Sequence, residues 1–209
     1  MRNRETHARA LDFVRRYIEE RDPVATKLKK RFPFRRLADH CRRASMWAER
    51  ICAVEGGDAE VVALSALFHD IGKCEDNTHE GHAIAGARIC GEYLASAGFD
   101  EKKRGRIVEI VRNHIHHAEA QTLEARIESD ADLLDETGAL TVLWDAMAVG
   151  GEDEQSYEIA LARIRKTYDR IASDAGDGFH TAAGRRFYGE RVQFLAEFLK
   201  NLEWELGIE

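Results

Sequence analysis

Proline is nearly absent from this chain of 209 residues: the two prolines are Pro23 and Pro33, and none follows them. Because proline breaks helix interiors, the long proline-free stretch that begins at Phe34 favours helices. The sequence also lacks any run of alternating apolar and polar residues that would demand a strand. We therefore predict an all-α fold.

Long apolar runs are missing as well. No run is long enough to cross a bilayer, and the first residues, Met1 to Glu5, contain no apolar signal-peptide core. Positive charge is not in excess either, since 38 acidic residues outweigh 31 Lys and Arg to give a net charge of −7. A general nucleic-acid binder usually presents a basic face. We expect a cytoplasmic protein with neither a membrane nor a nucleic-acid partner.

Cysteine is scarce, and no two cysteines form a C-x-x-C pair. The four are Cys41, Cys52, Cys74 and Cys90. Scattered single thiols in a chain of this size indicate reduced, mostly buried residues. Structural zinc sites usually draw on closely spaced pairs, so this pattern disfavours a four-cysteine zinc site.

What the sequence does contain is helical periodicity, interrupted by glycines and polar caps. The spacing predicts helices over about residues 5–20, 35–54, 59–70, 80–97, 101–116, 123–148, 156–173 and 181–206. A hydrophobic content of 44% suffices for one sizeable core. We expect a single-domain helical bundle, in which residues 1–32 form an N-terminal helix and basic linker packed on the core. Residues 33–209 would form the main domain with a C-terminal helical extension.

The segment from Lys27 to Arg36 contains six basic and no acidic residues. It reads either as a solvated linker or as a functional patch. In the functional interpretation, Arg35 or Arg36, which lie close in sequence to His40, contacts a substrate phosphate.

The most informative segment is Phe68-His69-Asp70-Ile71-Gly72-Lys73, which follows an apolar, alanine-rich run typical of a buried helix. Burying an imidazole and a carboxylate is costly unless each has a partner, and a metal ion satisfies both. His40 stands 29 residues before His69, and Asp132 stands 62 residues after Asp70. Two imidazoles and two carboxylates suit Mn²⁺, Fe²⁺, Ni²⁺, Co²⁺, Mg²⁺ or Zn²⁺.

In this order, His40, His69-Asp70 and Asp132 resemble the signature of the HD-domain superfamily of metal-dependent phosphohydrolases. The segments 39–44, 68–73, 82–87 and 129–135 resemble the surrounding motifs, and the tail resembles a small, mostly uncharacterised bacterial branch. The resemblance spans about residues 33 to 206. It implies an HD-type helical fold, metal ligation by His40, His69, Asp70 and Asp132, and hydrolysis of a phosphoester by a metal-activated water.

We predict Asp70, Lys73, His82 and His114 as catalytic residues. In some HD proteins, histidines at the places of His82 and His114 help to hold a second metal, with the Asp of the His-Asp pair bridging, whereas in others they face the substrate. Both roles stay open, so one metal ion is expected and a second is an alternative. Lys73 either contacts a phosphate or simply ends a helix. His116 and His117 are expected to be exposed to solvent.

The leading interpretation is therefore a phosphohydrolase acting on a small phosphorylated molecule, with a nucleotide as the expected class from the resemblance alone. A di-iron oxygenase of the same fold and a non-catalytic nucleotide-binding module are the alternatives. A homodimer is a further expectation, because the last helix is rich in Phe and Leu.

Overall fold

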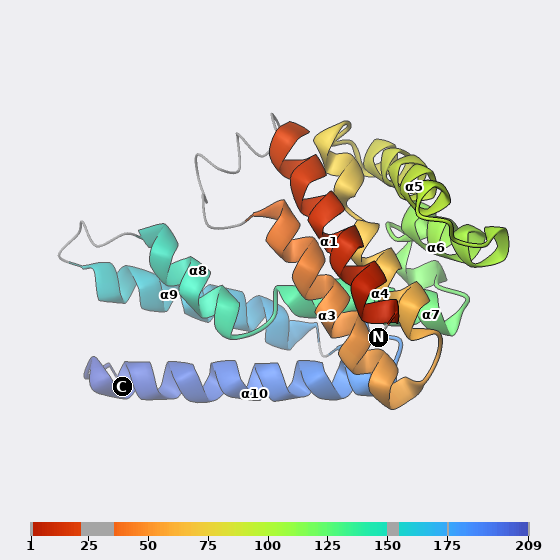
Figure 1. Cartoon of the computed structure of the whole chain (residues 1–209). Helices are drawn as coiled ribbons and strands as arrows, with labels where there is room; N and C mark the ends of the chain where they lie inside the picture. The colour runs from red at the N-terminus through yellow and green to blue at the C-terminus, as the bar shows by residue number, and fades with distance from the viewer. Residues whose placement is uncertain (1, 22–35, 150–154, 175, 209) are drawn as a thin grey trace.

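The computed structural model describes residues 2–21, 36–149, 155–174 and 176–208, and every regular element within these ranges is a helix (Figure 1). The α-helices are α1 (Arg2–Arg21), α3 (Leu37–Glu55), α4 (Ala59–Phe68), α5 (His79–Ser96), α6 (Glu101–Asn113), α7 (Leu123–Asp135), α8 (Ala139–Val149), α9 (Ser156–Ser173) and α10 (Ala182–Glu205). Two short 3-10 helices are η1 (Ile71–Cys74) and η2 (His117–Glu119). The all-α prediction is confirmed.

Helix α4 lies at the centre of the bundle because it is apolar on all sides. Leu64 and Phe68 belong to an apolar cluster shared with α1, α5 and α6, whereas Val62 and Ala66 belong to a second cluster shared with α7, α9 and α10. A helix that is hydrophobic all round is a buried helix. Its carboxyl end therefore delivers the residues that follow it into the interior of the protein.

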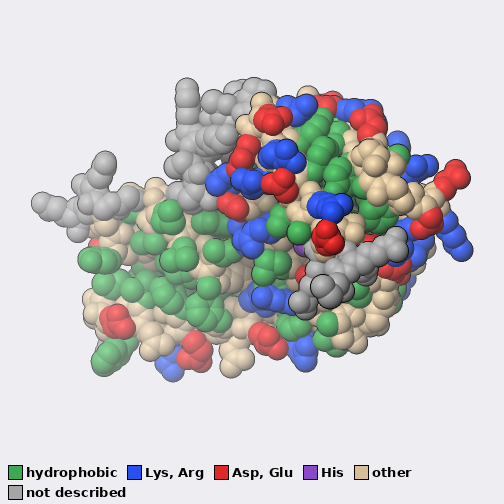
Figure 2. Space-filling view, viewed as in Figure 1, with side chains coloured by type: hydrophobic (Ala, Val, Ile, Leu, Met, Phe, Trp, Pro, Cys, Tyr) green, Lys and Arg blue, Asp and Glu red, His purple; other side chains and the backbone are tan. Residues whose placement is uncertain are grey.

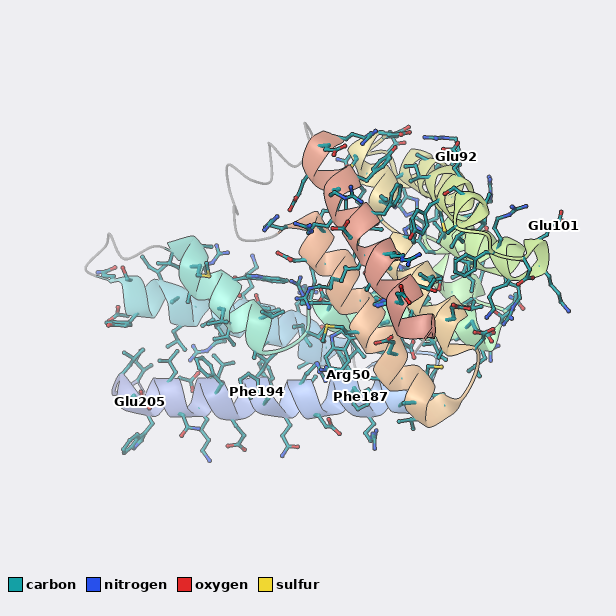
Figure 3. The ribbon with its side chains drawn as sticks, in the orientation of Figure 1. Arg50, Glu92, Glu101, Phe187, Phe194 and Glu205 are labelled. Carbon is teal, nitrogen blue, oxygen red and sulfur yellow. The ribbon has the colours of Figure 1, made fainter. Side chains whose placement is uncertain are left out.

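Helices α8, α9 and α10 extend to one side of this bundle, and the long α10 passes beneath α3 (Figure 1). The ring of Phe187 on α10 lies 5.8 Å from that of Trp47 on α3. Figure 3 labels Phe187 beside Arg50 of α3, where the two helices approach. Apolar side chains gather on the surface over α8 to α10, whereas charged side chains crowd the surface over α1, α3 and α5 (Figure 2).

Polar caps begin the helices as the sequence predicts. The Asp58 carboxylate accepts hydrogen bonds from the amides of Glu60 and Val61 at the start of α4. Thr181 accepts from the amide of Gly184 at the start of α10. Gly56 ends α3 with a positive φ of 85°, a conformation in which a side chain would be strained. These caps satisfy backbone groups that a helix end leaves unpaired.

The helix expected over residues 123–148 is wrong as a single element, because it is broken between Asp135 and Ala139. The Thr137 amide and hydroxyl both donate to the carbonyl of Leu134, at 3.3 and 2.9 Å. Such local bonding of a threonine competes with the helical ladder and allows the chain to turn. The helix predicted to reach residue 116 also ends earlier, at Asn113.

Most of the basic segment Lys27 to Arg36 and the predicted division after residue 32 lie outside the described residues, so both remain predictions. Arg36 itself pairs with Glu19 of α1 and more distantly with Asp39, at 3.9 Å. All four cysteines are buried and free, as expected. Among the described helices, none has the length and apolar character needed to span a membrane.

Candidate metal centre

Four histidines and two aspartates from five parts of the chain converge at the end of α4. They are His40 of α3, His69 and Asp70 after α4, His82 of α5, His114 after α6 and Asp132 of α7. His69 and Asp70 are only 1% and 3% exposed. The fold thus brings together every metal ligand that the sequence predicts, together with His82 and His114.

The first group of donor atoms surrounds His40 and His69. Their Nε2 atoms lie 3.1 Å apart. Asp132 Oδ1 lies 3.1 Å from the His40 nitrogen and 3.4 Å from that of His69. Asp70 Oδ2 lies 3.6 and 3.5 Å from the same two atoms. Two imidazoles and two carboxylates therefore present one donor atom each to a common point.

The second group uses the other oxygen of Asp70. The Nε2 atoms of His82 and His114 lie 3.1 Å apart, and Asp70 Oδ1 lies 3.6 and 3.5 Å from them. Asp70 thus stands between the two groups and offers one carboxylate oxygen to each. This is the arrangement that a carboxylate bridging two ions would need.

Every one of the four imidazoles is oriented by a bond from Nδ1. His69, His82 and His114 donate to the backbone carbonyls of Ala66, Thr78 and Val111, at 2.7 to 2.8 Å. His40 donates to the carboxylate of Asp135 at 2.8 Å. These acceptors can only accept, so each Nδ1 carries a proton and each Nε2 is left to act as a ligand.

Two such Nε2 atoms at 3.1 Å bring their lone pairs face to face, which is unfavourable unless a proton or a cation lies between them. Ligands that sit about 2.0–2.2 Å from a metal ion lie about 3.0–3.6 Å from one another. All the donor separations above fall in that range. The chemistry and spacing of both donor groups therefore fit a divalent cation.

The electrostatics of the metal-free centre show the same need for positive charge. Burial opposes protonation of His40 and His69, yet hydrogen bonds and charges from Asp132, Asp135 and Asp70 outweigh it and raise their pKa values to about 10 and about 9. Burial likewise opposes ionisation of Asp70 and Asp132, but the neighbouring histidines hold the pKa of each carboxyl well below its usual range. Protons thus occupy positions that a metal would take.

Lys73, predicted as catalytic, reaches into the centre and pairs with Asp70 Oδ2. Burial disfavours its charge, but the Asp70 carboxylate raises the pKa of the ammonium. Lys73 is therefore a fixed cation at the mouth of the site. It lines a cavity of about 560 Å³ that we call the α3–α9 cavity.

The α3–α9 cavity opens directly onto His40, Asp70 and Asp132. Its far wall comes from α8, α9 and the turn that follows, including Trp144, Arg170 and Phe179. The cavity therefore joins the donor groups to residues of α8, α9 and the turn after α9.

Sequence reasoning missed Arg43, which lies one turn after His40. Its guanidinium donates two hydrogen bonds to the Asp135 carboxylate, at 2.6 and 2.9 Å. The same carboxylate accepts from Nδ1 of His40 and so orients the ring of a predicted ligand. The i, i+3 spacing of His40 and Arg43 on one helix was the available signal.

His117 departs from the expected solvent exposure, whereas His116 is exposed as predicted. The His117 ring pairs with the Ser129 hydroxyl at 2.8 Å, and its Nε2 lies 3.9 Å from Asp132 Oδ2. Sequence reasoning also missed Glu128, whose burial raises its pKa to about 7. Its signal was a carboxylate placed one turn before Asp132.

Comparison with known proteins adds a family assignment. Residues 37–137 match the HD domain. The chain is 30% identical over 137 residues to ribonuclease Y of Rubrobacter xylanophilus, which is 64% of this chain and 22% of that protein. It is 30% identical over 177 residues to tRNA (cytidine(56)-2′-O)-methyltransferase of Picrophilus torridus, covering 77% of this chain and 49% of that protein. The chain thus spans half or less of the length of these relatives.

Solved structures resemble this chain over nearly its whole length. An HD superfamily hydrolase from an uncultured Thermotogales bacterium has a TM-score of 0.66 at 23% identity, covering 95% of this chain and 92% of that one. Bacillus subtilis YpgQ in complex with ADP has a TM-score of 0.62 at 20% identity, covering 98% and 97%. At this identity the likeness concerns the fold, and it includes the C-terminal helices α8 to α10.

Proposed function

Because residues 37–137 place this chain in the HD-domain superfamily, we propose that it is a metal-dependent phosphohydrolase acting on a small phosphorylated molecule, with a nucleotide as the preferred class. One observation carries the proposal. Four imidazole Nε2 atoms are turned toward the two oxygens of Asp70 and the nearer oxygen of Asp132, in two groups that each fit a divalent cation.

In this proposal His40, His69, Asp70 and Asp132 hold the first ion, and His82, His114 and the second oxygen of Asp70 hold another. Bound ions would polarise a phosphoryl oxygen and lower the pKa of a water molecule to supply the nucleophile. The chain's own contribution is orientation. Backbone carbonyls fix three imidazole rings, and the Arg43–Asp135 pair fixes that of His40.

The α3–α9 cavity is the proposed substrate site, since it opens onto the donor groups and carries cationic side chains. Lys73 stands beside Asp70, and Arg170 on the far wall pairs with no carboxylate among the described residues. Trp144 and Phe179 supply aromatic surface. A volume of about 560 Å³ lies within the range of about 300–1,000 Å³ that is typical of small-molecule sites. The ADP complex of YpgQ supports the nucleotide class by analogy of fold.

Asp70→Asn is the decisive test, because both donor groups depend on this carboxylate. The wild-type protein, loaded with Mn²⁺, would be assayed against nucleoside mono-, di- and triphosphates, a simple phosphomonoester and a short RNA. We expect turnover of a small phosphoester, and a fall in kcat of at least about 10²-fold in the variant. Mn²⁺ binding should be lost at both groups while circular dichroism keeps its helical signal.

Asp169→Asn, an exposed position on α9, serves as the matched control and should retain wild-type turnover. Full metal occupancy and activity in the Asp70 variant would refute the proposal. Cleavage of RNA in preference to every small substrate would refute the expected substrate class.

The pair of donor groups joined by Asp70 also suits the di-iron oxygenase alternative. Anaerobic purification followed by elemental analysis separates the two functions, since two irons per chain with substrate-dependent O₂ uptake would favour the oxygenase. Tight nucleotide binding without turnover in every metal would favour the non-catalytic module. The expected homodimer stays a prediction, for which the exposed apolar side chains of Leu143, Met147, Tyr157 and Phe194 on α8 to α10 offer a surface (Figure 2).

A further inference from the structure

A second cavity of about 560 Å³ lies between α6 and α7 and shares no lining residue with the α3–α9 cavity. We call it the α6–α7 cavity. Its wall includes His114, which is also a member of the second donor group, and the adjacent pair of His117 and Ser129. The proposed metal centre is therefore bordered by two separate cavities, one beside His40 and Asp132 and the other beside His114.

The wall of the α6–α7 cavity contains an anomaly, the side chain of Glu128. The residue is only 1% exposed, and Oε1 receives no hydrogen bond from any described residue. Its neighbours Ile127 and Ala131 on α7 are buried in the apolar core. A buried carboxyl group without a partner costs free energy that a leucine or methionine would not. Folding alone gives no reason for a glutamate here.

The position of Glu128 supplies such a reason. It lies one turn before Asp132, so both carboxylates stand on the same face of α7. Asp132 reaches the first donor group, and Glu128 lines the cavity beside His114 of the second. Glu124, a further turn back on the same wall, has partners at Oε1, which accepts bonds from Arg106 at 2.8 Å and from the Asp58 amide at 3.1 Å. Of the described carboxylates on this wall, Glu128 is the buried one, and its Oε1 has no hydrogen-bond partner among the described residues.

We propose that Glu128 is a positioning residue that accepts a hydrogen bond from water in the α6–α7 cavity and holds that water on the His114 side of the metal centre. A cavity of this size accommodates several water molecules, and its polar lining supplies the further partners that an ordered water needs. The α6–α7 cavity would then bring water to the centre while a substrate fills the α3–α9 cavity. The catalytic consequence rests on the proposed function, whereas the role of Glu128 toward metal and water does not.

Glu128→Leu tests the inference through stability as well as turnover. In the metal-free protein, replacing an unpartnered carboxyl group by an apolar side chain of similar size should raise Tm by about 2–4 °C. With Mn²⁺ and the best small phosphoester, kcat should fall at least about tenfold with KM unchanged. Glu128→Gln, whose amide oxygen still accepts a hydrogen bond, should retain more of kcat than the leucine variant.

Mn²⁺ titration by calorimetry gives a readout that needs no activity. The second equivalent of Mn²⁺ should bind about tenfold more weakly in the leucine variant, and the first should bind as in the wild type. The matched control is Glu60→Leu, which lies outside both cavities, removes the carboxylate that pairs with Lys103 at 2.7 Å and should lower Tm without changing kcat.

A fall in Tm of the metal-free Glu128→Leu protein would show an ordinary structural role and overturn the inference. Unchanged kcat together with unchanged Mn²⁺ affinity would overturn it as well. If the wild-type protein binds Mn²⁺ but hydrolyses no phosphoester, the proposed function fails, and the Tm and titration results still decide the role of Glu128.

Discussion

The ring of His40 is held from behind by a carboxylate that is itself held by an arginine. Asp135 accepts from His40 Nδ1, and Arg43 donates two hydrogen bonds to the same carboxylate. His40 belongs to the first donor group alone, because its Nε2 atom faces His69 and Asp132. A substitution at the partners of the His40 ring should therefore weaken binding of the ion at the first donor group and leave binding at the second unchanged.

We expect Asp135→Asn to weaken the first equivalent of Mn²⁺ by about tenfold and to leave the second unchanged. The amide keeps the size of the carboxylate but loses the charge that pairs with Arg43 and makes the His40 ring a better ligand. Electron paramagnetic resonance of free Mn²⁺ during titration measures both equivalents, with Asp169→Asn as the control. Equal weakening of both equivalents would contradict the separation of the two donor groups.

For single residues, the sequence predicts the candidate metal ligands better than it predicts the side chains that pack around those ligands. Residue type and order are enough to predict the four ligands His40, His69, Asp70 and Asp132. An adjacent His and Asp in an apolar helix end are costly to bury unless a partner such as a metal ion satisfies both. Arg43 and Glu128 are not predicted in this way, since an arginine or a glutamate on a helix is ordinarily solvated and only packing shows otherwise. His117 was misjudged for the same reason, because its partner Ser129 lies on a different helix.

The attachment of α10 to α7 depends on one buried carboxylate. Asp130 accepts hydrogen bonds from the amides of His180 and Thr181, at 2.7 and 2.8 Å, and from the Thr181 hydroxyl at 2.6 Å. A Cβ at Gly184 would lie 2.2 Å from the same carboxylate, so the first turn of α10 closes directly on it. Asp130 lies two residues before Asp132 on α7, so the start of α10 is attached close in sequence to a candidate metal ligand.

Asp130→Ala should lower the free energy of unfolding by about 3 kcal/mol, because it leaves buried donors unpaired and removes a charge-assisted cap. We expect Tm to fall by about 6–12 °C while the helical content of the folded protein is kept. Differential scanning calorimetry measures the change, and Asp177→Ala, an exposed position in the preceding turn, should stay within about 0.5 kcal/mol of wild type. A shift as small as that of the control would show that α10 is held by its apolar face alone.

Elements with clear ends could be predicted from the sequence, and elements with a hidden break could not. The helix expected over 156–173 agrees with α9, and the one over 181–206 differs from α10 by a single residue at each end. Thr122, Thr181 and Asp58 mark helix starts through local chemistry. The break between α7 and α8 has no proline to announce it, and the hydrogen bonds from Thr137 to the Leu134 carbonyl that accompany it are seen only in the structure.

Considered as a whole, the molecule places its charges unevenly. The net charge is −7, whereas the α3–α9 cavity is lined by four cationic side chains, Arg36, Arg43, Lys73 and Arg170, and by four carboxylates, Asp70, Asp132, Glu136 and Asp174. A metal ion held by Asp70 and Asp132 would offset their charge, and the cationic side chains of the cavity would then favour a small anion that can enter it, whereas the acidic surface repels polymeric anions in general. This supports the expected small substrate over a nucleic acid. The apolar surface over α8 to α10 is where the expected dimer contact would lie, and the dimer itself stays a prediction (Figure 2).

The stability of the metal-free protein should fall between about pH 7 and pH 10. His40 and His69 have pKa values raised from 6.5 to about 10 and about 9 by the surrounding carboxylates. A raised pKa means that the folded state binds the proton more tightly, so its contribution is complete below about pH 6.5 and is lost as the pH rises through the folded values. His82, whose pKa is lowered by burial, acts in the opposite sense but below pH 6.5.

Urea unfolding of the metal-free protein at pH 7, 8.5 and 10 measures this loss, and His40→Asn should flatten it because it removes the histidine with the higher pKa. Mn²⁺ binds neutral imidazole, so metal binding at pH 7.5 should release protons, which calorimetry in buffers of different ionisation enthalpy detects. The loaded protein should then keep its stability across the same pH range, since the ligand histidines no longer exchange protons. The prediction is wrong if the stability of the metal-free protein stays level or rises from pH 7 to pH 10 and metal binding releases no protons. In that case His40 and His69 are not protonated in the metal-free protein.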